Sequence, residues 1–386
     1  MSLHVCMVAN TAWSMWNFRR GLISSLVLRG YRITIVAPSD HTVPWLCELG
    51  CSFIPLRLSA KGTNPFIDLR TMWELIKIYG DFDIDLAIHY TVKPNIYGSF
   101  AAHYCRLPTL AITTGLGYAF LSNGWVSRVV MLLYKYALKY PRIVVFLNKD
   151  DRDEFILRGL VDESKTLLFP GEGVDLDFFH PSDQSVMKTD GELCFLLIAR
   201  LLWDKGIGEY VEAAKKIRSI YPNVKFQLLG DVQANNPSAI DHNLLSEWID
   251  EGILEYLGTT DDVRPIIMQS DCVVLPSYRE GVPRTILEAA AMAKPIIVSN
   301  VPGCRDVVQH GNTGLLCQAR SVMSLTCALT EFIKMPSEQR ISMGNAGRQF
   351  IASNFDEKKV NDIYLNLIEH RFDVVSPSEQ NSKRGA

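Results

Sequence analysis

Short apolar runs alternate with longer segments of helical periodicity along almost the whole chain. Most of the runs are continuously apolar and rich in β-branched residues, as in 32–38 and 193–199, and few alternate apolar with polar residues. Strands of this kind are buried on both faces, as in a parallel sheet that helices cover. The pattern therefore predicts an α/β protein.

The expected strands form two series. The first series comprises 3–10, 32–38, 52–58, 86–90, 109–114, 142–148 and 166–170, and the second comprises 193–199, 225–230, 253–258, 272–277, 295–299 and 314–317. Helices are expected at 17–29, 65–79, 95–105, 126–140, 207–220, 262–269, 284–293, 321–334, 337–354 and 356–371. Two such series predict two doubly wound, Rossmann-like domains.

A polar stretch rich in Pro and Gly separates the two series, and a chain of 386 residues suits about two domains. We expect a front domain at 1–170, a linker at 171–192 and a rear domain at 193–355. A helix at 356–375 is expected to pack back on the front domain, before a disordered tail at 376–386. Ligands of doubly wound sheets bind at the carboxyl ends of the strands, so two domains facing a central cleft would suit an enzyme with two substrates.

Composition and charge exclude several classes of protein. No run of about 20 apolar residues predicts a membrane span, and the first residues lead directly into a strand without a secretory leader. The nine cysteines are scattered, without Cys-x-x-Cys or zinc-site spacing, so we expect reduced core thiols and no metal site.

Residues 1–149 hold 15 Lys and Arg against 7 Asp and Glu, a charge of +8. This basic half predicts an anionic partner, but no basic helix with base-reading residues indicates nucleic acid.

Two carboxylates flank the expected start of the helix at 284–293. Glu280 precedes Pro283, which suits a first helical turn, and Glu288 lies inside the helix. The start of a helix attracts phosphate, and a carboxylate beside it can hold ribose hydroxyls. The alternative is a helix-capping Glu280 and a surface Glu288.

Two cations follow the first strand of the rear domain. Arg200 and Lys205 lie in the turn that leads into the next helix. Arg offers a rigid fork for phosphate oxygens and Lys a mobile point charge. The alternative is an ordinary solvated turn.

Together these motifs resemble those of a known family. Arg200…Lys205-Gly206 followed by Glu280-x7-Glu288 resembles the signature of the retaining GT-B glycosyltransferases of family four. The resemblance covers nearly the whole chain, and the front half is similar to bacterial enzymes that act on polyprenyl-diphosphate-linked oligosaccharides. The N,N'-diacetylbacillosaminyl-diphospho-undecaprenol N-acetylgalactosaminyltransferase group is the nearest of these.

The resemblance implies a role for each matching residue. Arg200 and Lys205 would bind the donor diphosphate, and Glu280 would contact the donor sugar; these three are the expected catalytic residues. Glu288 would hold the ribose. The remaining donor-binding candidates are Gly281, Val282, Gly230, Asp231 and Thr259. The family favours a UDP-sugar such as UDP-GalNAc or UDP-GlcNAc, although the motifs do not fix the base. The front domain would bind a lipid-linked saccharide acceptor, with Asn17, Arg19, His89, Lys93 and Gly115 as candidates.

Two positions depart from the family pattern. The first loop, 10–14, lacks the glycine pair of many relatives. Many relatives also carry a histidine where this chain has Tyr90, and His89 stands one residue earlier. A shift of one residue on a strand turns a side chain to the opposite face. His89 is therefore either catalytic or a packed strand-end histidine.

The expected chemistry is hexosyl transfer with retention of configuration, without a metal or cofactor. Breaking the anomeric bond leaves negative charge on the departing diphosphate, which preorganised cations and helix N–H groups stabilise. Residues 193–355 contain no Asp-x-Asp motif; Asp83-Ile84-Asp85 has that spacing in the front half, where a solvated turn is the simpler interpretation.

A basic, aromatic-flanked helix at 126–140 is amphipathic, as are helices that lie on anionic membranes. An ordinary core-packing helix is the alternative. With the basic front half, it predicts a cytoplasmic protein held peripherally on the inner face of the plasma membrane. The lipopolysaccharide, O-antigen, capsule, exopolysaccharide and protein-glycan pathways all remain open.

Three other functions compete with glycosyl transfer. A dehydrogenase would need the Gly-x-Gly-x-x-Gly loop, which the first turn lacks. A GT-B sugar-nucleotide epimerase would not require the Glu280/Glu288 spacing. A non-catalytic sugar-nucleotide-binding module would tolerate loss of Glu280.

Overall fold

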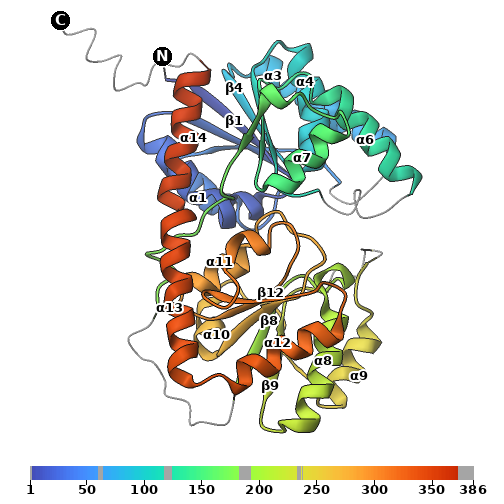
Figure 1. Ribbon diagram of the computed structural model, residues 1–386. Helices are drawn as coiled ribbons and strands as arrows, with labels where there is room; N and C mark the ends of the chain where they lie inside the picture. Colours follow the sequence, from blue (N-terminus) through green and yellow to red (C-terminus); the bar gives the residue numbers. More distant parts are fainter. Residues whose placement is uncertain are drawn as a thin grey trace, which may run out of the picture. The chain divides into compact units, whose positions relative to one another are not determined.

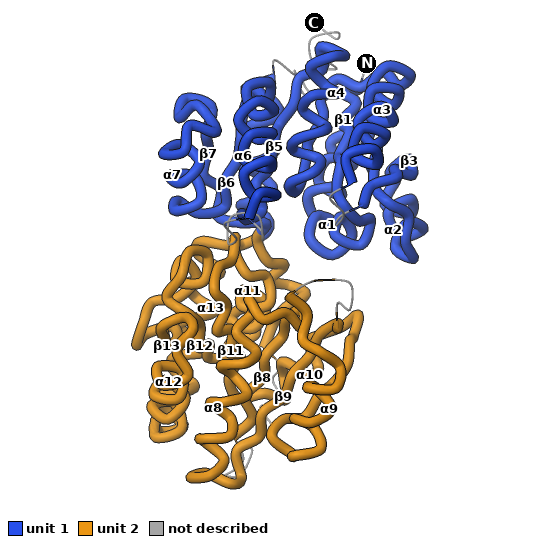
Figure 2. The backbone as a smooth tube through the Cα atoms, turned by 90° about the vertical axis from the view of Figure 1, so that its right-hand side faces the viewer, with its two compact units in different colours: residues 1–172, 357–386 blue, residues 173–356 orange. Residues whose placement is uncertain are grey.

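The computed structural model describes residues 2–59, 64–116, 124–181, 193–232, 236 and 238–372. The chain forms two compact units, each with its own parallel sheet (Figure 2). Unit 1 comprises residues 1–172 and 357–386, and unit 2 comprises residues 173–356.

The sheet of unit 1 has seven parallel strands in the order β3-β2-β1-β4-β5-β6-β7. The strands are β1 (His4–Val8), β2 (Arg32–Ala37), β3 (Ser52–Pro55), β4 (Leu86–Tyr90), β5 (Thr109–Thr113), β6 (Ile143–Phe146) and β7 (Thr166–Leu168). Every residue of β1, β4, β5 and β6 is buried. Continuous apolar runs form these strands because helices cover both faces of the sheet.

The helical segments of unit 1 lie on the two faces of this sheet. They are α1 (Ala12–Leu28), α2 (Val43–Glu48), α3 (Pro65–Asp81), the π-helical turn η1 (Pro94–Gly98), α4 (Ser99–Tyr104), α6 (Trp125–Ala137), α7 (Lys149–Leu157), the 3-10 turn η2 (Glu163–Lys165) and α14 (Glu357–Arg371). Helices α3, α4 and α6 cover one face, and α1 and α14 cover the other (Figure 1).

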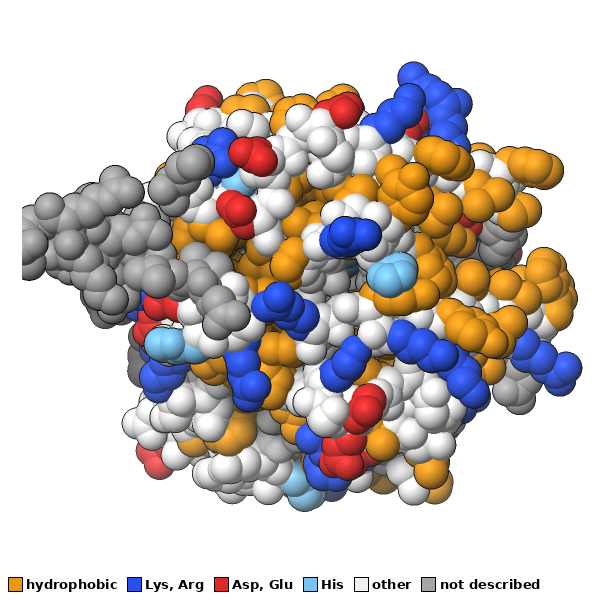
Figure 3. Space-filling view, turned by 90° about the horizontal axis from the view of Figure 1, so that it is seen from above, with side chains coloured by type: hydrophobic (Ala, Val, Ile, Leu, Met, Phe, Trp, Pro, Cys, Tyr) orange, Lys and Arg blue, Asp and Glu red, His pale blue; other side chains and the backbone are white. Residues whose placement is uncertain are grey.

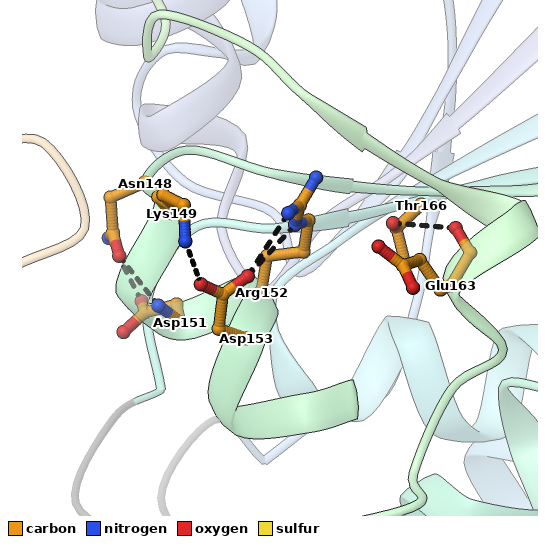
Figure 4. Close-up of polar contacts among 7 residues, drawn as sticks. All are labelled: Asn148, Lys149, Asp151, Arg152, Asp153, Glu163 and Thr166. Atoms are coloured by element: carbon orange, nitrogen blue, oxygen red, sulfur yellow. Dashed lines mark hydrogen bonds and ion pairs between the residues drawn. The ribbon is translucent and has the colours of Figure 1, made fainter. Parts of the chain in front are cut away.

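Helix α7, which the sequence analysis did not predict, owes its start to a side-chain cap (Figure 4). The Oδ1 atom of Asn148 accepts a hydrogen bond from the N–H of Asp151 at 2.8 Å. Lys149 and Arg152 both pair with Asp153 within the first turns. This polar capping, and not an apolar stripe, marks the helix, which explains why periodicity missed it.

The sheet of unit 2 has six parallel strands in the order β10-β9-β8-β11-β12-β13. The strands are β8 (Cys194–Ile198), β9 (Lys225–Leu229), β10 (Glu255–Tyr256), β11 (Cys272–Leu275), β12 (Ile296–Ser299) and β13 (Gly314–Cys317). The helical segments are η3 (Trp203–Lys205), α8 (Ile207–Ile220), α9 (His242–Asp250), α10 (Arg264–Gln269), α11 (Arg284–Ala291), η4 (Arg305–Val307), α12 (Val322–Lys334) and α13 (Ser337–Asn354).

Both sheets reverse their direction of growth at one place. In unit 1 the chain builds outward from β1 to β3, then returns to start β4 on the other side of β1. Unit 2 repeats this with β8 to β10 and then β11. The loops after the two central strands diverge to opposite faces at such a point, which opens a crevice at the carboxyl edge of the sheet.

The boundary between the units differs from the expected linker. Within 171–192, the described residues from Gly173 onward belong to unit 2, where Val174 and Phe179 are buried in the core. The local composition of this stretch, rich in turn-forming residues, did not indicate that its apolar side chains pack into the core of unit 2. Helix α14 belongs to unit 1, where it packs on α1. Residues 182–192 and the expected tail at 376–386 lie outside the described residues.

All nine cysteines are free thiols, and six of them are buried. None of the described helices combines the length and apolarity that crossing a bilayer requires.

Candidate functional site

The strongest sequence motifs lie in two loops at the carboxyl ends of β8 and β11. Residues 199–206 follow β8, and residues 276–283 follow β11. These strands are neighbours at the reversal point of unit 2. The parallel topology therefore brings the two motifs to one edge of the sheet, although they are distant in the sequence.

Backbone contacts hold the two loops together. The carbonyl oxygen of Asp204 accepts hydrogen bonds from the N–H of Tyr278 at 2.9 Å and from the hydroxyl of Ser277 at 3.1 Å. Gly206 has a φ of +73°, and a Cβ added there would lie 2.1 Å from the carbonyl oxygen of Pro276. No residue with a side chain fits this approach without displacing backbone.

Lys205 and Glu280 meet directly across the two loops. The Nζ atom of Lys205 lies 2.5 Å from Oε1 of Glu280, and the side chains are 13% and 15% exposed. Because both side chains keep some exposure to solvent, an anionic or hydroxyl-bearing ligand can reach this short ion pair. The two residues that the sequence placed on separate turns are thus partners in one site.

A third loop, after β12, supports the backbone of Glu280. The N–H of Glu280 donates to the carbonyl oxygen of Pro302 at 3.2 Å. Gly303 has a φ of +81°, and a Cβ there would lie 2.4 Å from the carbonyl oxygens of Glu280 and Gly281. Gly206 belongs to the motif quoted from the sequence, whereas Gly303 was not predicted as a site residue; its position directly after Pro302 is the only local signal for it.

Glu288 lies on α11, about one turn beyond the helix start, and is 8% exposed. The Nε atom of Arg284 lies 3.5 Å from Oε1 of Glu288, and Nη1 of Arg284 donates to the carbonyl oxygen of Gly173 at 2.6 Å. Burial contradicts the interpretation of Glu288 as a surface residue. Arg284, which the sequence analysis did not single out, is its i, i+4 neighbour.

The remaining donor-side candidates lie on turns of the same edge. Arg200 is exposed and forms no ion pair within the described residues. Gly230, after β9, donates its N–H to the carbonyl oxygen of Gly258 at 2.8 Å, and its own carbonyl accepts from the hydroxyl of Tyr256 at 2.8 Å. A Cβ on Gly230 would lie 1.8 Å from the carbonyl oxygen of Ala199. Asp231 and Thr259 are exposed on these turns.

In unit 1 the corresponding edge carries a strained residue. Thr91, directly after β4, has a φ of +73°, which is rare for a β-branched residue. The π-helical turn η1 begins three residues later, and π-helical turns are frequent at functional sites. Strain of this kind persists where the surrounding structure imposes it, so the end of β4 is the second candidate region.

His89 lies inside unit 1. Its side chain is fully buried, its Nε2 atom is hydrogen-bonded to the Tyr79 hydroxyl at 2.8 Å, and the two rings stack. A Cβ on Gly98 would lie 2.7 Å from Nε2, so the glycine of η1 leaves the space that the imidazole occupies. Burial lowers the pKa of His89 to about 3. This placement contradicts the interpretation of His89 as an acceptor-side catalytic residue and fits the packed histidine.

Arg19 is also buried. Its Nη2 atom lies 2.6 Å from Oε1 of Glu172, and its guanidinium lies over the Tyr90 ring at 4.0 Å. Burial, the largest single effect, lowers the pKa of Arg19, but the Glu172 carboxylate together with Tyr90 and Tyr364 outweighs it, and the net shift of the pKa is upward. The Arg19 side chain is thus enclosed, and its charge is neutralised internally by Glu172.

The other acceptor-side candidates remain at the carboxyl edge. Lys93 pairs with Asp68 at 2.6 Å, and Gly115 follows β5 with a φ of +138°. Asn17, on α1, donates to the carbonyl oxygen of Trp13 at 3.0 Å. Thr11 caps α1 by accepting from the N–H of Ser14 at 3.1 Å, in the loop that lacks the glycine pair.

Comparison with known proteins assigns both halves of the chain to glycosyltransferase families. Residues 4–148 match the family described as "Glycosyl transferase 4-like", and residues 181–350 match "Glycosyl transferases group 1".

Two curated relatives and one solved structure show the extent of the similarity. The chain is 26% identical to the N,N'-diacetylbacillosaminyl-diphospho-undecaprenol alpha-1,3-N-acetylgalactosaminyltransferase of Campylobacter jejuni, over 95% of this chain and 98% of that protein. It is 27% identical to the UDP-Gal:alpha-D-GlcNAc-diphosphoundecaprenol alpha-1,3-galactosyltransferase of Escherichia coli, over 79% and 81%. HepE from Anabaena, solved with UDP and glucose, has a TM-score of 0.76 at 17% identity, covering 95% and 99%. This structural similarity supports the GT-B fold.

The burial of His89 predicts a pH dependence of stability. The unfolded chain binds a proton at His89 near the ordinary pKa of 6.5, and the folded chain does so only near about 3. Stability is therefore lost as the pH falls through this window, by up to about 1.4 kcal/mol per pH unit. We expect the unfolding free energy of His89→Gln, from urea titrations at several pH values, to depend less on pH. His242→Gln, at an exposed position, is the control; equal slopes for both variants would contradict the assignment.

Proposed function

This chain is a glycosyltransferase: its N-terminal half matches the glycosyl transferase 4-like family, and its C-terminal half matches glycosyl transferases group 1. We propose that it moves a sugar from a UDP-sugar to a lipid-linked saccharide. The transfer retains the anomeric configuration and needs no metal. The curated relatives, which are named for undecaprenyl-diphosphate-linked saccharides, support this substrate class.

The contact between Lys205 and Glu280 carries the proposal. It lies at the carboxyl edge of β8 and β11, where doubly wound domains bind nucleotides. In this assignment Lys205 and the exposed Arg200 bind the donor diphosphate, and Glu280 holds hydroxyls of the donor sugar. When the donor enters, Lys205 turns from the Glu280 carboxylate to the diphosphate, and Glu280 accepts hydrogen bonds from the donor-sugar hydroxyls in its place.

Other residues of the same edge bind the rest of the donor. The buried carboxylate of Glu288 accepts hydrogen bonds from the ribose hydroxyls, and Arg284 orients it. The backbone of Gly281 and Val282 supports the sugar. The turns that carry Gly230, Asp231 and Thr259 seat the uracil, since the hydrogen bond from the N–H of Gly230 to the carbonyl oxygen of Gly258 joins them.

The reaction then follows from the charges. The bond between the anomeric carbon and the diphosphate oxygen breaks, and the acceptor oxygen bonds to the same carbon. The acceptor proton passes to the departing diphosphate oxygen. Lys205 and Arg200 stabilise the negative charge that develops there, which is the role that a metal would otherwise have.

We assign the acceptor to unit 1. The strained end of β4 at Thr91, with Lys93, Gly115 and Asn17 on the same edge, is the proposed binding region. Arg19 and His89 act beneath it as buried supports.

We further propose that α6 attaches unit 1 to an anionic membrane. Trp125, Val129, Leu132 and Tyr136 form an exposed apolar stripe along this helix. Arg128 and Lys135 are exposed beside the stripe, and α6 contains no acidic residue. An apolar stripe flanked by cations suits the interface of an anionic leaflet. We assign the protein to the inner face of the plasma membrane, where lipid-linked acceptors are elongated.

Removing either partner of the central ion pair tests the donor site. Glu280→Gln and Lys205→Ala should each lower kcat by about 10²–10³, because a preorganised charge is lost where charge develops. UDP release from a UDP-sugar with a lipid-linked acceptor measures this. Lys216→Ala removes an exposed lysine of the same unit and should leave the rate unchanged. A wild-type rate in either site variant, with wild-type melting, would sink the assignment.

Stereochemistry and metal dependence test the proposed chemistry. With an α-linked UDP-sugar, the anomeric proton of the product should show the small coupling of an α-linkage in NMR spectra. EDTA should leave the rate within about twofold, because the cations of the site stabilise the leaving group. A β-linked product would refute retention, and activity lost to EDTA and restored by a divalent cation would refute metal independence.

Charge placed on the stripe of α6 tests membrane attachment. Leu132→Glu should weaken binding to vesicles with anionic lipid by about tenfold, as measured by co-sedimentation, because a carboxylate is repelled by the lipid and removes apolar area. Leu28→Glu, at an exposed position at the end of α1, is the matched control in the same unit. Equal loss in both variants would argue against a specific role for α6.

A further inference from the structure

A groove of about 770 Å³ opens at the opposite, amino edge of the sheet in unit 1. Its lining includes the segments that lead into β5 and β6, together with residues of α3 and α4. The apolar part of this lining consists of Met72, Ile76, Phe100, Leu107 and Pro108. The groove therefore offers an apolar floor away from both candidate regions described above.

Aromatic side chains form the rim. Tyr104 on α4 is 73% exposed, although it lines the groove. Tyr140 stacks on His103 with 3.8 Å between the ring centroids. Amphipathic rings of this kind favour the boundary between hydrocarbon and lipid headgroups.

Two arginines, Arg106 and Arg142, line the same groove, and none of its lining residues is Asp or Glu. Neither arginine forms an ion pair within the described residues; Arg142 lies over the Phe372 ring at 5.6 Å. The groove thus combines an apolar floor with a positive charge that no carboxylate neutralises, which complements an anionic amphiphile.

The backbone at Arg106 adds an independent observation. The φ of Arg106 is +56°, in the left-handed region, and this residue follows the end of α4. The N–H of Arg106 donates to the carbonyl oxygen of His103, and the N–H of Leu107 donates to the carbonyl oxygen of Ala102. Glycine is the favoured residue at this position of a helix end. An arginine costs about 1 kcal/mol there. Glycine would therefore fit this position without strain, and the arginine can be removed without disturbing the end of the helix.

An exposed apolar stripe lies beside the groove. On α3 it consists of Phe66, Leu69 and Trp73, with Lys77 exposed beside it and Arg70 paired with Glu74 at 3.1 Å. Helix α6, with its own stripe, covers the same face of the sheet (Figure 1). Figure 3, which looks down on the top of Figure 1, shows hydrophobic side chains gathered beside Lys, Arg and His. Tyr140, three residues after the end of α6, lines the groove, so the groove lies next to the end of the helix proposed above to meet the membrane.

We propose that this groove binds the phosphate headgroup and the first part of the acyl chains of an anionic phospholipid. Arg106 and Arg142 bind the phosphate, the apolar floor receives the chains, and Tyr104 and Tyr140 lie at the level of the headgroups. This inference rests on the proposed membrane attachment of unit 1 and adds that the attachment is selective for anionic phospholipids.

The lipid of this groove is distinct from the lipid of the acceptor. The groove lies where β5 and β6 begin, whereas the proposed acceptor region lies where β4 ends. Five residues of strand span roughly 16 Å. One lipid site at each edge lets the phospholipid orient unit 1 while the acceptor reaches the other edge.

A short-chain phosphatidylglycerol, used as a soluble monomer, tests the groove without a membrane. It should raise the melting temperature of the wild type, because it binds only the folded state. Phosphatidylcholine of the same chain length and inorganic phosphate should give no shift. An equal shift with inorganic phosphate would overturn the lipid assignment, since it would show a phosphate site only, and an equal shift with phosphatidylcholine would overturn the role of charge.

Arg106→Gly is the decisive variant. Glycine suits the left-handed backbone, so the melting temperature without lipid should be unchanged or higher. Its affinity for phosphatidylglycerol should fall by about tenfold or more, because a charge-assisted contact is lost. Arg32→Ala removes an exposed arginine from the same edge of the sheet, at the start of β2. This control should bind within about threefold of the wild type; equal losses in both variants would overturn the groove.

The catalytic assignment is tested separately. Release of UDP from a UDP-sugar with a soluble acceptor should be the same in Arg106→Gly as in the wild type. If no UDP-sugar supports turnover while the lipid shift persists, the proposed function fails and the groove stands. If turnover is normal and phosphatidylglycerol causes no shift in the wild type, the groove fails alone.

Discussion

The burial of parallel strands on both faces is the constraint on which this structure depends. Helices must cover each face, so every connection crosses from one edge of the sheet to the other, and the loops after the strands share the carboxyl edge. Where the order reverses, at β1/β4 and at β8/β11, those loops diverge. Arg200, Lys205, Glu280 and the strained Thr91 all follow one of the strands that flank a reversal point.

Close backbone contacts then make the donor edge rigid. Gly206, Gly230 and Gly303 each lie where a side chain would overlap a neighbouring carbonyl group. These approaches join the loops after β8, β9, β11 and β12 into one layer. The ion pair of Lys205 and Glu280 is thereby held before any ligand arrives, which is the condition for electrostatic stabilisation of a departing diphosphate.

The two edges of the sheet in unit 1 differ in how their charged residues are paired. At the carboxyl edge, charges are paired internally, as in Arg19–Glu172 and Lys93–Asp68. At the amino edge, Arg106 and Arg142 have no carboxylate partner in the part of the chain that the structure describes, and aromatic side chains surround them. Part of the positive charge of the front half is therefore neutralised at the carboxyl edge, while two arginines of the amino edge have no carboxylate partner within the described residues.

The sequence by itself determined the two parallel α/β units, because hydrophobic periodicity is a local property: every expected strand range contains an observed strand. It also named both partners of the Lys205–Glu280 contact. Only the tertiary structure decided that His89 is enclosed by Tyr79 and Gly98, and that Arg19 is neutralised by Glu172, 153 residues away. It alone brought Arg106 and Arg142 into one groove. Burial and charge pairing arise from contacts between residues distant in the chain, and no local pattern records them.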